Sequence, residues 1–455
     1  MLIEKYDINK INPASYNPRY LSEDKKQSLI ESISEVGFLK PIIINSNNTI
    51  IAGHQRSKCM LILGKTHVPA FIIDGITKTD EVRFNQMHNG SDIEIGEGDI
   101  VKVNTDKIGW HYVKPYQIEI IKLGKNANQK KELSRLFLKY GEFGSCVLDS
   151  ENNCIISSDY ASVSKMMNKE LYVFKENNSL KVNLIKKYFS LSYGEFSYDL
   201  LEKQTYIQCL AQMNRLAGEK QFKSILYEKV VIPNINKAER ILDFGAGKMA
   251  YVKNLKTQGF NIFGIEFYLR KTGQNVIDYK KVIELIDCVV EDIKQNGLFD
   301  VVVCDSVLNS VDSIEAHNSV INTIRTLCKP NGKLFFSGRC YEFVEKLSKV
   351  EKTKDKQNYL YFYDKNLFTA NFRSGNWFYQ KFHTIKMVKE ICKTISNKNI
   401  KIMRFNSSSF QCYLNNDIEL SNKDKKKAID FEFNLPLPNG KTYGKNKSIN
   451  NILGL

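Results

Sequence analysis

The chain has 455 residues and a formal net charge of +16, with 42% hydrophobic and 25% charged residues. This composition is typical of a globular protein and excludes a wholly disordered or collagen-like chain. No stretch approaches the roughly 18 apolar residues of a membrane span, and the first residues show no signal-peptide pattern. The ten cysteines include no CxxC pair and the six histidines are scattered, so we expect no metal site and a cytoplasmic protein with reduced thiols.

The positive charge concentrates in the C-terminal quarter, where residues 341–455 carry +10 of the +16. A basic region of this kind is the electrostatic footprint of a polyanion binder. Only 11 of the 66 basic residues are Arg, however, so AT-rich codon usage is an alternative explanation. The charge favours DNA as a partner and indicates nothing about oligomeric state.

The first 90 residues read as a small α+β unit. A helix over 25–36 is capped by Ser22 and ends at Gly37. Strands over 41–44 and 49–52 flank a polar turn, and Gly53 then opens a helix that ends at Gly64. A strand over 68–73 closes the unit.

The next segment, 91–178, repeats this order of elements. Its helix over 130–140, its hairpin and its last strand place Gly141 and Asn152 104 residues after Gly37 and Asn48. The box Gly53-His54-Gln55-Arg56 becomes Ser158-Asp159-Tyr160-Ala161, so the polar pattern is lost. A degenerate internal repeat and chance similarity both remain open. A helical connector over 179–235 follows, with helices expected at 204–217 and 220–231.

From residue 236 to 414, strands alternate with helices, which predicts a parallel sheet flanked by helices. An apolar strand over 240–244 runs into the glycine turn 245–247, and the strand over 261–265 ends at Glu266. We expect further strands at 288–292 and 299–305, and a fifth after the turn at 330–332. Ligands of such sheets bind at the carboxyl ends of the strands, where Gly245, Glu266, Asp292 and Asp305 would gather.

At these residues the chain resembles the class I S-adenosylmethionine-dependent methyltransferases, with a seven-stranded Rossmann-like fold. The helix over 386–395 and the strands over 400–405 and 410–414 resemble the end of that family's domain. Lys248 and Met249 depart from the small residues common in the loop. The resemblance implies contacts to the methionine and sulfonium from Asp243, Gly245 and Gly247, to the ribose from Glu266 and to adenine from Asp292. The whole implied cofactor site is Asp243, Phe244, Gly245, Ala246, Gly247, Glu266, Phe267, Asp292 and Asp305.

The methyl acceptor is not indicated by a motif. Base amino-methylating enzymes carry [DNS]-P-P-[YFW] after strand four, but this chain has Asp305-Ser306-Val307-Leu308-Asn309. No Pro-Cys pair for attack on cytosine is present there either. The catalytic base is therefore unknown; Asp305 and Asn309 are candidates by position, and we favour a cofactor contact or helix cap for Asp305.

An insertion over 342–384 is rich in aromatic residues, which make up ten of the 25 residues at 358–382. Aromatic faces stack bases and basic side chains hold phosphates, so Arg373, Trp377 and Tyr379 are candidate substrate-binding residues. Core packing is the alternative. The last segment, 415–455, reads as a basic polar tail that is weakly ordered or extended.

The N-terminal unit resembles the ParB/sulfiredoxin superfamily in Asn17-Pro18-Arg19 and in Gly53-His54-Gln55-Arg56. The resemblance implies a nucleotide-binding pocket, with a nucleoside triphosphate and Mg²⁺ as its ligands. A helix N-terminus beside an Arg fork is also a ready anion site. Gln55 stands where Arg or His is commoner, and no Cys lies inside the box.

Three functional hypotheses follow. The first is a methyltransferase acting on DNA or a modified nucleobase, with the ParB-like module for targeting, as in phage or mobile-element modification proteins. The second is a nucleotide-dependent DNA-binding switch protein whose glycine loop holds the cofactor only structurally. The third is a small-molecule methyltransferase whose basic charge is compositional.

Overall fold

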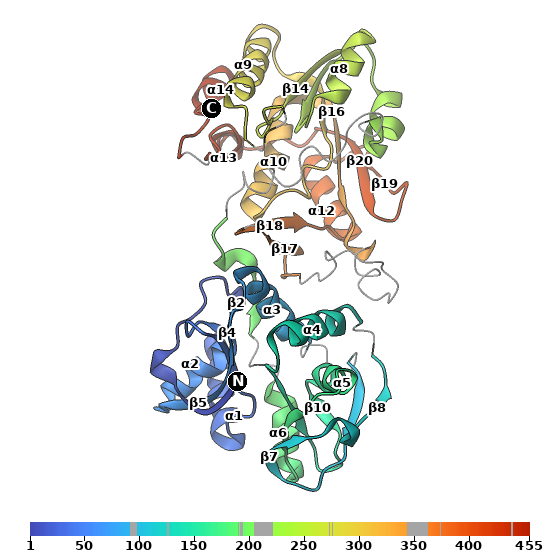
Figure 1. The fold of residues 1–455 in the computed structure, drawn as a ribbon. Helices are drawn as coiled ribbons and strands as arrows, with labels where there is room; N and C mark the ends of the chain where they lie inside the picture. Colours follow the sequence, from blue (N-terminus) through green and yellow to red (C-terminus); the bar gives the residue numbers. More distant parts are fainter. Residues whose placement is uncertain are drawn as a thin grey trace. The chain divides into compact units, whose positions relative to one another are not determined.

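The structure is a computed structural model that describes residues 1–91, 98–124, 127–189, 191, 194–203, 222–272, 274, 276–343, 363–373, 375–437 and 440–455. The chain forms two compact units, the first built mainly from residues 1–201 and the second mainly from residues 202–455 (Figure 1). The predicted helix at 204–217 lies outside the described residues. The segment that follows includes a π-helix, Tyr227–Val231, within the range predicted as a helix over 220–231.

The first unit begins with a four-stranded sheet of order β1-β5-β3-β4. The central strand β3 pairs in parallel with β5 and antiparallel with β4. Every element predicted for residues 20–73 is present, because its caps and apolar runs are local signals. The strands are β1 (Leu2–Asp7), β2 (Arg19–Tyr20), β3 (Ile42–Asn45), β4 (Ile50–Ala52) and β5 (His67–Ile73), and the helices are α1 (Glu23–Val36), α2 (His54–Ile62) and α3 (Lys78–Ser91).

A second four-stranded sheet in the same unit has the corresponding order β7-β11-β9-β10. Its β9 pairs in parallel with β11 and antiparallel with β10. Residues of both halves belong to one buried core, including Phe71 of β5 and Phe84 of α3 from the first half and Phe143 and Val173 from the second. The elements are β6 (Ile100–Val103), β7 (Gly109–Val113), β8 (Ile118–Lys122), α4 (Ala127–Tyr140), β9 (Ser145–Leu148), β10 (Cys154–Ile156), α5 (Ser158–Met166), β11 (Leu171–Lys175), α6 (Ser179–Tyr188) and β12 (Glu195–Phe196).

The register predicted for the second box is wrong by one residue. Gly53 precedes α2 with a left-handed backbone, and the residue that precedes α5 in the same conformation is Ser157. The segment Gly53–Arg56 therefore corresponds to Ser157–Tyr160, because the hairpin turn sets where the next helix begins.

The second unit is built on a mixed sheet of order β14-β13-β15-β16-β20-β19. Strands β14, β13, β15 and β16 are parallel. Strand β20 runs antiparallel to β16, in agreement with the predicted closing hairpin. Its strands and first helices are β13 (Arg240–Phe244), α8 (Ala250–Thr257), β14 (Asn261–Ile265), α9 (Tyr279–Asn296), β15 (Phe299–Cys304), α10 (Ile314–Leu327), β16 (Cys328–Arg339), α12 (Ile385–Ile395), β19 (Lys401–Met403) and β20 (Ser409–Asn415). The class I α/β arrangement is thus confirmed, but the sheet has six strands among the described residues, where seven were predicted.

The missing strand is the one predicted at 288–292, which lies inside helix α9. The buried side chains Val282, Ile286, Val289 and Ile293 are spaced at three and four residues, the helical period. The short apolar run at 288–290 is therefore part of a helical stripe. Asp292 consequently does not lie at the cofactor crevice.

Instead, Asp292 forms an ion pair with Arg240, the first residue of β13. Arg240 stands at the amino end of the sheet, whereas the crevice lies at the carboxyl end. The predicted adenine contact from Asp292 is therefore wrong, and the pair holds α9 to the sheet.

The predicted polar tail is also wrong, because residues 415–455 form helices α13 (Asn422–Glu432) and α14 (Asn446–Leu453). Helix α13 packs against α10 and α14 against α9 (Figure 1). Phe433 and Tyr443 pack on the ring of Phe267, with centroids 5.2 and 6.0 Å away. The segment is basic on its exposed side, yet its apolar side completes the core of the second unit.

The insertion contributes a two-stranded sheet, β17 (Phe368–Arg373) and β18 (Asn376–Lys381). Among the helices that the structure describes, none is long and apolar enough to cross a bilayer.

Candidate functional site

Three carboxylates meet at the carboxyl ends of adjacent strands in the second unit. Asp243 lies next to the last residue of β13, Glu266 follows β14, and Asp305 follows β15. Glu266 accepts hydrogen bonds from the backbone N–H of Gly247 at 2.8 Å and of Tyr268 at 3.0 Å. The acid predicted to bind a ribose therefore faces the glycine loop, as the predicted crevice requires.

Two of these acids carry strongly raised pKa values. Burial raises the pKa of Asp243 to about 7; the Tyr227 hydroxyl opposes the rise, and Asp305 and Glu266 add to it. Burial likewise raises the pKa of Glu266 to about 7, against the two backbone N–H donors. Near neutral pH these two acids are therefore partly protonated. A cationic ligand in the crevice would favour their charged form.

The glycine loop is held against the neighbouring strand. The N–H groups of Gly245 and Ala246 both donate to the carbonyl oxygen of Ile265 at 2.9 Å. Gly245 has φ +80°, and a Cβ there would press on the Val307 side chain, so only glycine fits. Met249, which departs from the family pattern, packs against Gly264. A Cβ on Gly264 would lie only 2.7 Å from Met249 Sδ. The absence of that Cβ makes room for the larger loop residue.

Asp305 accepts hydrogen bonds from three serine hydroxyl groups. Its Oδ2 accepts from Ser224 Oγ at 2.6 Å, and its Oδ1 accepts from Ser337 at 2.5 Å and from Ser306 at 3.3 Å. Both carboxylate oxygens are therefore hydrogen-bonded to neighbouring serines, which fix the orientation of this side chain. The geometry therefore favours a positioning role for Asp305 over that of a catalytic base.

Ser224 and Ser337 lie 81 and 32 residues from Asp305 in sequence and were not predicted. Ser224 begins the segment whose π-helix places Tyr227 on the ring of Tyr251 in α8, with centroids 4.0 Å apart. An isolated serine has no signature in a single sequence, so no signal pointed to it.

The insertion lies beside the loop that follows β15. The backbone N–H of Lys381 in β18 donates to the carbonyl oxygen of Asn309 at 3.2 Å. Asn309 is buried, and its side-chain Oδ1 has no hydrogen-bond partner among the described residues. Such an orphaned acceptor fits a group that receives an N–H or O–H from a ligand.

The predicted substrate-binding residues Trp377 and Tyr379 differ in exposure. Tyr379 is only 2% exposed and lies under the ammonium of Lys203, 4.4 Å from the ring centroid, so it packs in the core. Trp377 is half-buried, and Arg373 ends β17. Of these, Trp377 is the aromatic residue with exposed surface that could still stack a base.

In the first unit, the residues of the predicted nucleotide box lie at the start of α2 and are buried. His54 Nε2 accepts from the N–H of Ala14 at 3.3 Å, and Gln55 Nε2 donates to the carbonyl oxygen of Arg19 at 3.4 Å. Burial, with Lys58 and Arg19 nearby, lowers the pKa of His54 to about 3, so this ring is neutral. The two predicted motifs, around Arg19 and around Gln55, are thus in contact.

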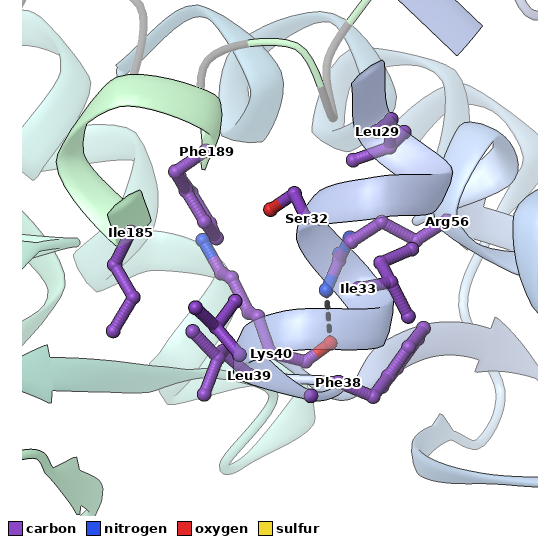
Figure 2. A pocket seen from close by; sticks show the side chains of 11 residues that line it. Leu29, Ser32, Ile33, Phe38, Leu39, Lys40, Arg56, Ile185 and Phe189 are labelled. Atoms are coloured by element: carbon purple, nitrogen blue, oxygen red, sulfur yellow. Dashed lines mark hydrogen bonds between the residues drawn. The ribbon is translucent and has the colours of Figure 1, made fainter. Parts of the chain in front are cut away.

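Arg56 faces a small pocket between α1 and α6 (Figure 2). Its guanidinium donates to the carbonyl oxygen of Lys40 and lies 5.4 Å from the ring centroid of Phe38. Ile185 and Phe189 of the α6 region close the other side. The cavity volume is only about 20 Å³, room for a water molecule, so a nucleotide could enter only if this side moved.

Two family models match the chain. A ParB N-terminal domain covers residues 2–90, and a methyltransferase domain covers residues 211–380. A ParB-like nuclease domain-containing protein of Escherichia coli, YnaK, is 30% identical over 76 residues, which are 17% of this chain and 87% of that protein. The chain belongs to the ParB-domain proteins. It carries, in addition, an S-adenosylmethionine-dependent methyltransferase domain.

The methyltransferase domain has more distant relatives. A ubiquinone biosynthesis O-methyltransferase of Rickettsia typhi is 25% identical over 193 residues, which are 40% of this chain and 70% of that protein. Among solved structures, the N-methyltransferase NodS of Bradyrhizobium japonicum shares 8% identity over 47% of this chain and 99% of its own, with a TM-score of 0.29.

The boundaries of the two matches relate directly to the sites. The ParB domain match contains both box motifs and the whole first sheet. The methyltransferase match contains the glycine loop, Glu266, Asp305 and Asn309, but ends before α12, β19 and β20. Those three elements and the helices α13 and α14 lie outside the match but belong to the same compact unit.

Proposed function

We propose that this chain transfers a methyl group from S-adenosylmethionine to DNA or to a modified nucleobase, with the ParB domain as the nucleotide-binding and DNA-targeting module. The observation that carries the proposal is the presence of both domains in one chain. The buried acidic crevice of the second unit supports the transfer, and the +10 charge of residues 341–455 supports a polyanionic acceptor.

The crevice fits the cofactor in its chemistry. S-adenosylmethionine supplies an electrophilic methyl group on a sulfonium, and it carries a ribose diol. Glu266 would accept hydrogen bonds from the diol in place of the one it now takes from Gly247. Asp243, buried beside the loop, would face the positively charged part, while Asp305, held by its three serines, would keep the loop after β15 in place.

The acceptor would enter beside Asn309. Its buried, unpartnered Oδ1 would receive a hydrogen bond from the acceptor amine or hydroxyl and hold it toward the crevice. Trp377, on the strand that runs to Lys381, would supply a stacking surface for an extruded base. Lysines on the exposed side of α13, including Lys426 and Lys427, would hold phosphates.

The ParB box would bind a nucleoside triphosphate with Mg²⁺ through Arg56 and the start of α2. The closed pocket implies that binding displaces Ile185 and Phe189. Calorimetry of nucleotide binding by the full chain, with and without Mg²⁺, tests this part; no heat with any of the common nucleoside triphosphates would remove the nucleotide from the proposal.

A small-molecule acceptor is the second candidate, favoured by the likeness to ubiquinone biosynthesis O-methyltransferases and by the absence of the base-methylation motif at Asp305–Asn309. The deciding experiment incubates the protein with methyl-labelled cofactor and duplex DNA, single-stranded DNA or a metabolite extract. Label in DNA supports the first candidate and label only in a metabolite the second. Nucleotide binding without any transfer would favour the nucleotide-dependent switch.

A further inference from the structure

The two halves of the first unit follow one path through space. Helices α1 and α4, strands β4 and β10, and helices α2 and α5 each begin 104 residues apart and end 104 residues apart. The residues with positive φ also recur at this spacing, as in the pairs Gly37 and Gly141, Asn48 and Asn152, and Gly53 and Ser157. The family match covers only the first of these halves.

The turn between the hairpin strands is the same in both halves down to its hydrogen bonds. In the first, Asn45 Oδ1 accepts from the N–H groups of Asn47 and Thr49, each at 2.9 Å. In the second, Asp149 Oδ1 accepts from Glu151 at 3.1 Å and from Asn153 at 2.9 Å. The two sets of residues are again 104 positions apart.

The fourth residue of the box ties the second helix to the same backbone segment in each half. Arg56 donates to the carbonyl oxygen of Lys40. The corresponding Tyr160 accepts, at its hydroxyl, from the N–H of Gly144 at 3.1 Å and of Phe143 at 3.2 Å. Lys40 and Gly144 are equivalent positions, so different chemistry performs the same structural task.

The third residue of the box disfavours an anion at the second of these helices. Gln55 is neutral, but the corresponding Asp159 is a buried acid in the first turn of α5, where its Oδ1 accepts from the N–H of Asp99 at 3.0 Å. A carboxylate at a helix N-terminus takes the place that a phosphate would take and repels one.

The halves pack reciprocally. Helix α3 of the first packs on α4 of the second, where Asp80 accepts from Arg135 at 2.6 Å, Lys139 at 2.7 Å and Tyr140 at 2.5 Å. Helix α6 of the second packs on α1 of the first. Helices α3 and α6 occupy corresponding places in the two halves, and so do α1 and α4. The last helix of each half therefore packs against the first helix of the other half. Such reciprocity is the signature of a two-fold, isologous interface.

We infer that residues 98–189 are a degenerate second copy of the ParB-like domain that acts as a built-in partner for the first. It covers Phe71 of β5 and Phe84 of α3 in a shared core, and its α6 closes the Arg56 pocket. The two copies therefore form one cooperative unit with a single box. The cooperative unit does not depend on the proposed methyl transfer or on nucleotide binding.

Hydrogen exchange on the full chain tests this inference. Tyr160→Phe removes only the hydroxyl that holds Phe143 and Gly144 in the second copy. If the copies open together, amide exchange should rise by a similar factor, about tenfold, in α5 and in α2 of the first copy. Tyr116→Phe is the matched control, since Tyr116 is 80% exposed in the same copy and should change neither helix.

A second variant is included in case Tyr160→Phe changes amide exchange too little to measure. Val163→Ala opens a cavity at a fully buried position of α5 and should again raise exchange in both helices. If either variant raises exchange in α5 while α2 keeps its wild-type protection, the copies open independently and the built-in partner is refuted.

Discussion

The backbone N–H of Gly247 donates to Glu266 Oε2 at 2.8 Å, which places the acid after β14 directly against the glycine loop after β13. Both residues belong to short local patterns, but only the parallel pairing of β13 with β14 brings them together. This contact is the position that a ribose diol would occupy, and it leads to the first prediction.

Replacing Glu266 by Gln should weaken S-adenosylmethionine binding about tenfold or more. Gln keeps the size of the side chain but removes the charge that strengthens hydrogen bonds from the diol, which are worth about 1.5–3 kcal/mol each. Calorimetry with the cofactor measures the change. Glu284→Gln, an exposed position on α9, is the control and should bind as the wild type does. Unchanged affinity in the Glu266 variant would mean that the loop is not a cofactor site.

Cofactor affinity should rise with pH through about 7. Asp243 and Glu266 each have a pKa of about 7 in the ligand-free protein, and the cationic cofactor favours their charged forms. Affinity at pH 8 should therefore exceed that at pH 6 by about tenfold for one group that must lose its proton. Calorimetry across this range tests the slope, and Asp243→Asn should flatten it.

The stability of the ligand-free protein should change in the opposite direction. Both folded pKa values lie above the ordinary values of 3.8 and 4.5, so the folded state holds protons that the unfolded chain releases. The stabilising effect of these protons is complete below about pH 4 and is lost as the pH rises through 7. Thermal unfolding at pH 6 and pH 8 should show the loss, and Asp243→Asn should reduce it; a variant with the wild-type pH dependence would contradict the assignment.

Arg56→Ala should destabilise the first unit rather than only remove a ligand contact. The buried guanidinium donates to the Lys40 carbonyl and packs near Phe38, so its loss should cost about 1.5–3 kcal/mol in the free energy of unfolding. Urea unfolding measures this. Arg404→Ala on the second unit, whose guanidinium bonds Ser407 at an exposed turn, should leave the first unit unchanged. A fully stable Arg56 variant would show that the tether contributes little.

Gly194→Ala should loosen the segment that follows α6. Gly194 has φ +68°, and a Cβ would lie 2.5 Å from the carbonyl oxygen of Tyr20 and 3.5 Å from Gln55 Nε2. We expect a loss of about 1–3 kcal/mol and faster proteolysis near residues 194–201. Gly141→Ala has the same left-handed backbone but open space around its Cβ, so the difference between the two variants isolates the contact with Tyr20. Equal effects would assign the whole cost to backbone conformation.

If DNA is bound, replacing Lys425, Lys426 and Lys427 by Gln should make the salt dependence of binding shallower. For each phosphate that the variant no longer neutralises, the slope of log affinity against log salt should fall by about 0.9. Lys426 and Lys427 are exposed, whereas Lys425 is half-buried on the side of Ala428 and Ile429 and lies 4.0 Å from Glu419. Thermal unfolding of the triple variant therefore checks that its fold persists. Binding titrations at several salt concentrations measure the slope.

Two further variants separate charge from stacking. Changing Lys280, Lys281 and Lys294 on α9 to Gln removes the same charge elsewhere and should alter the slope less. Trp377→Ala should weaken binding with little change in slope, because stacking carries no charge. No DNA affinity at low salt would leave the small-molecule acceptor.

Local signals in the sequence determined most of the elements and both motifs. Ser22 and Gly37 mark the ends of α1, and the glycine turn after an apolar strand marks the predicted cofactor loop, because caps, turns and periodicity are set by residues a few positions apart. The predicted domain boundaries remain predictions.

Features that depend on contacts between residues far apart in sequence were decided only by the tertiary structure. A run of five residues, 288–292, fits a strand as well as a helix. The packing of α9 on the sheet selected the helix. Asp292 therefore lies at the amino end of the sheet, opposite the predicted crevice. The polar composition of 415–455 concealed an apolar side that is buried where α13 packs on α10 and where Phe433 and Tyr443 meet Phe267. Likewise, only one of the three hydroxyl partners of Asp305, Ser306, is its neighbour in sequence, and Ser224 lies 81 residues away. Contacts between residues so far apart depend on the path of the whole chain, which no local pattern specifies.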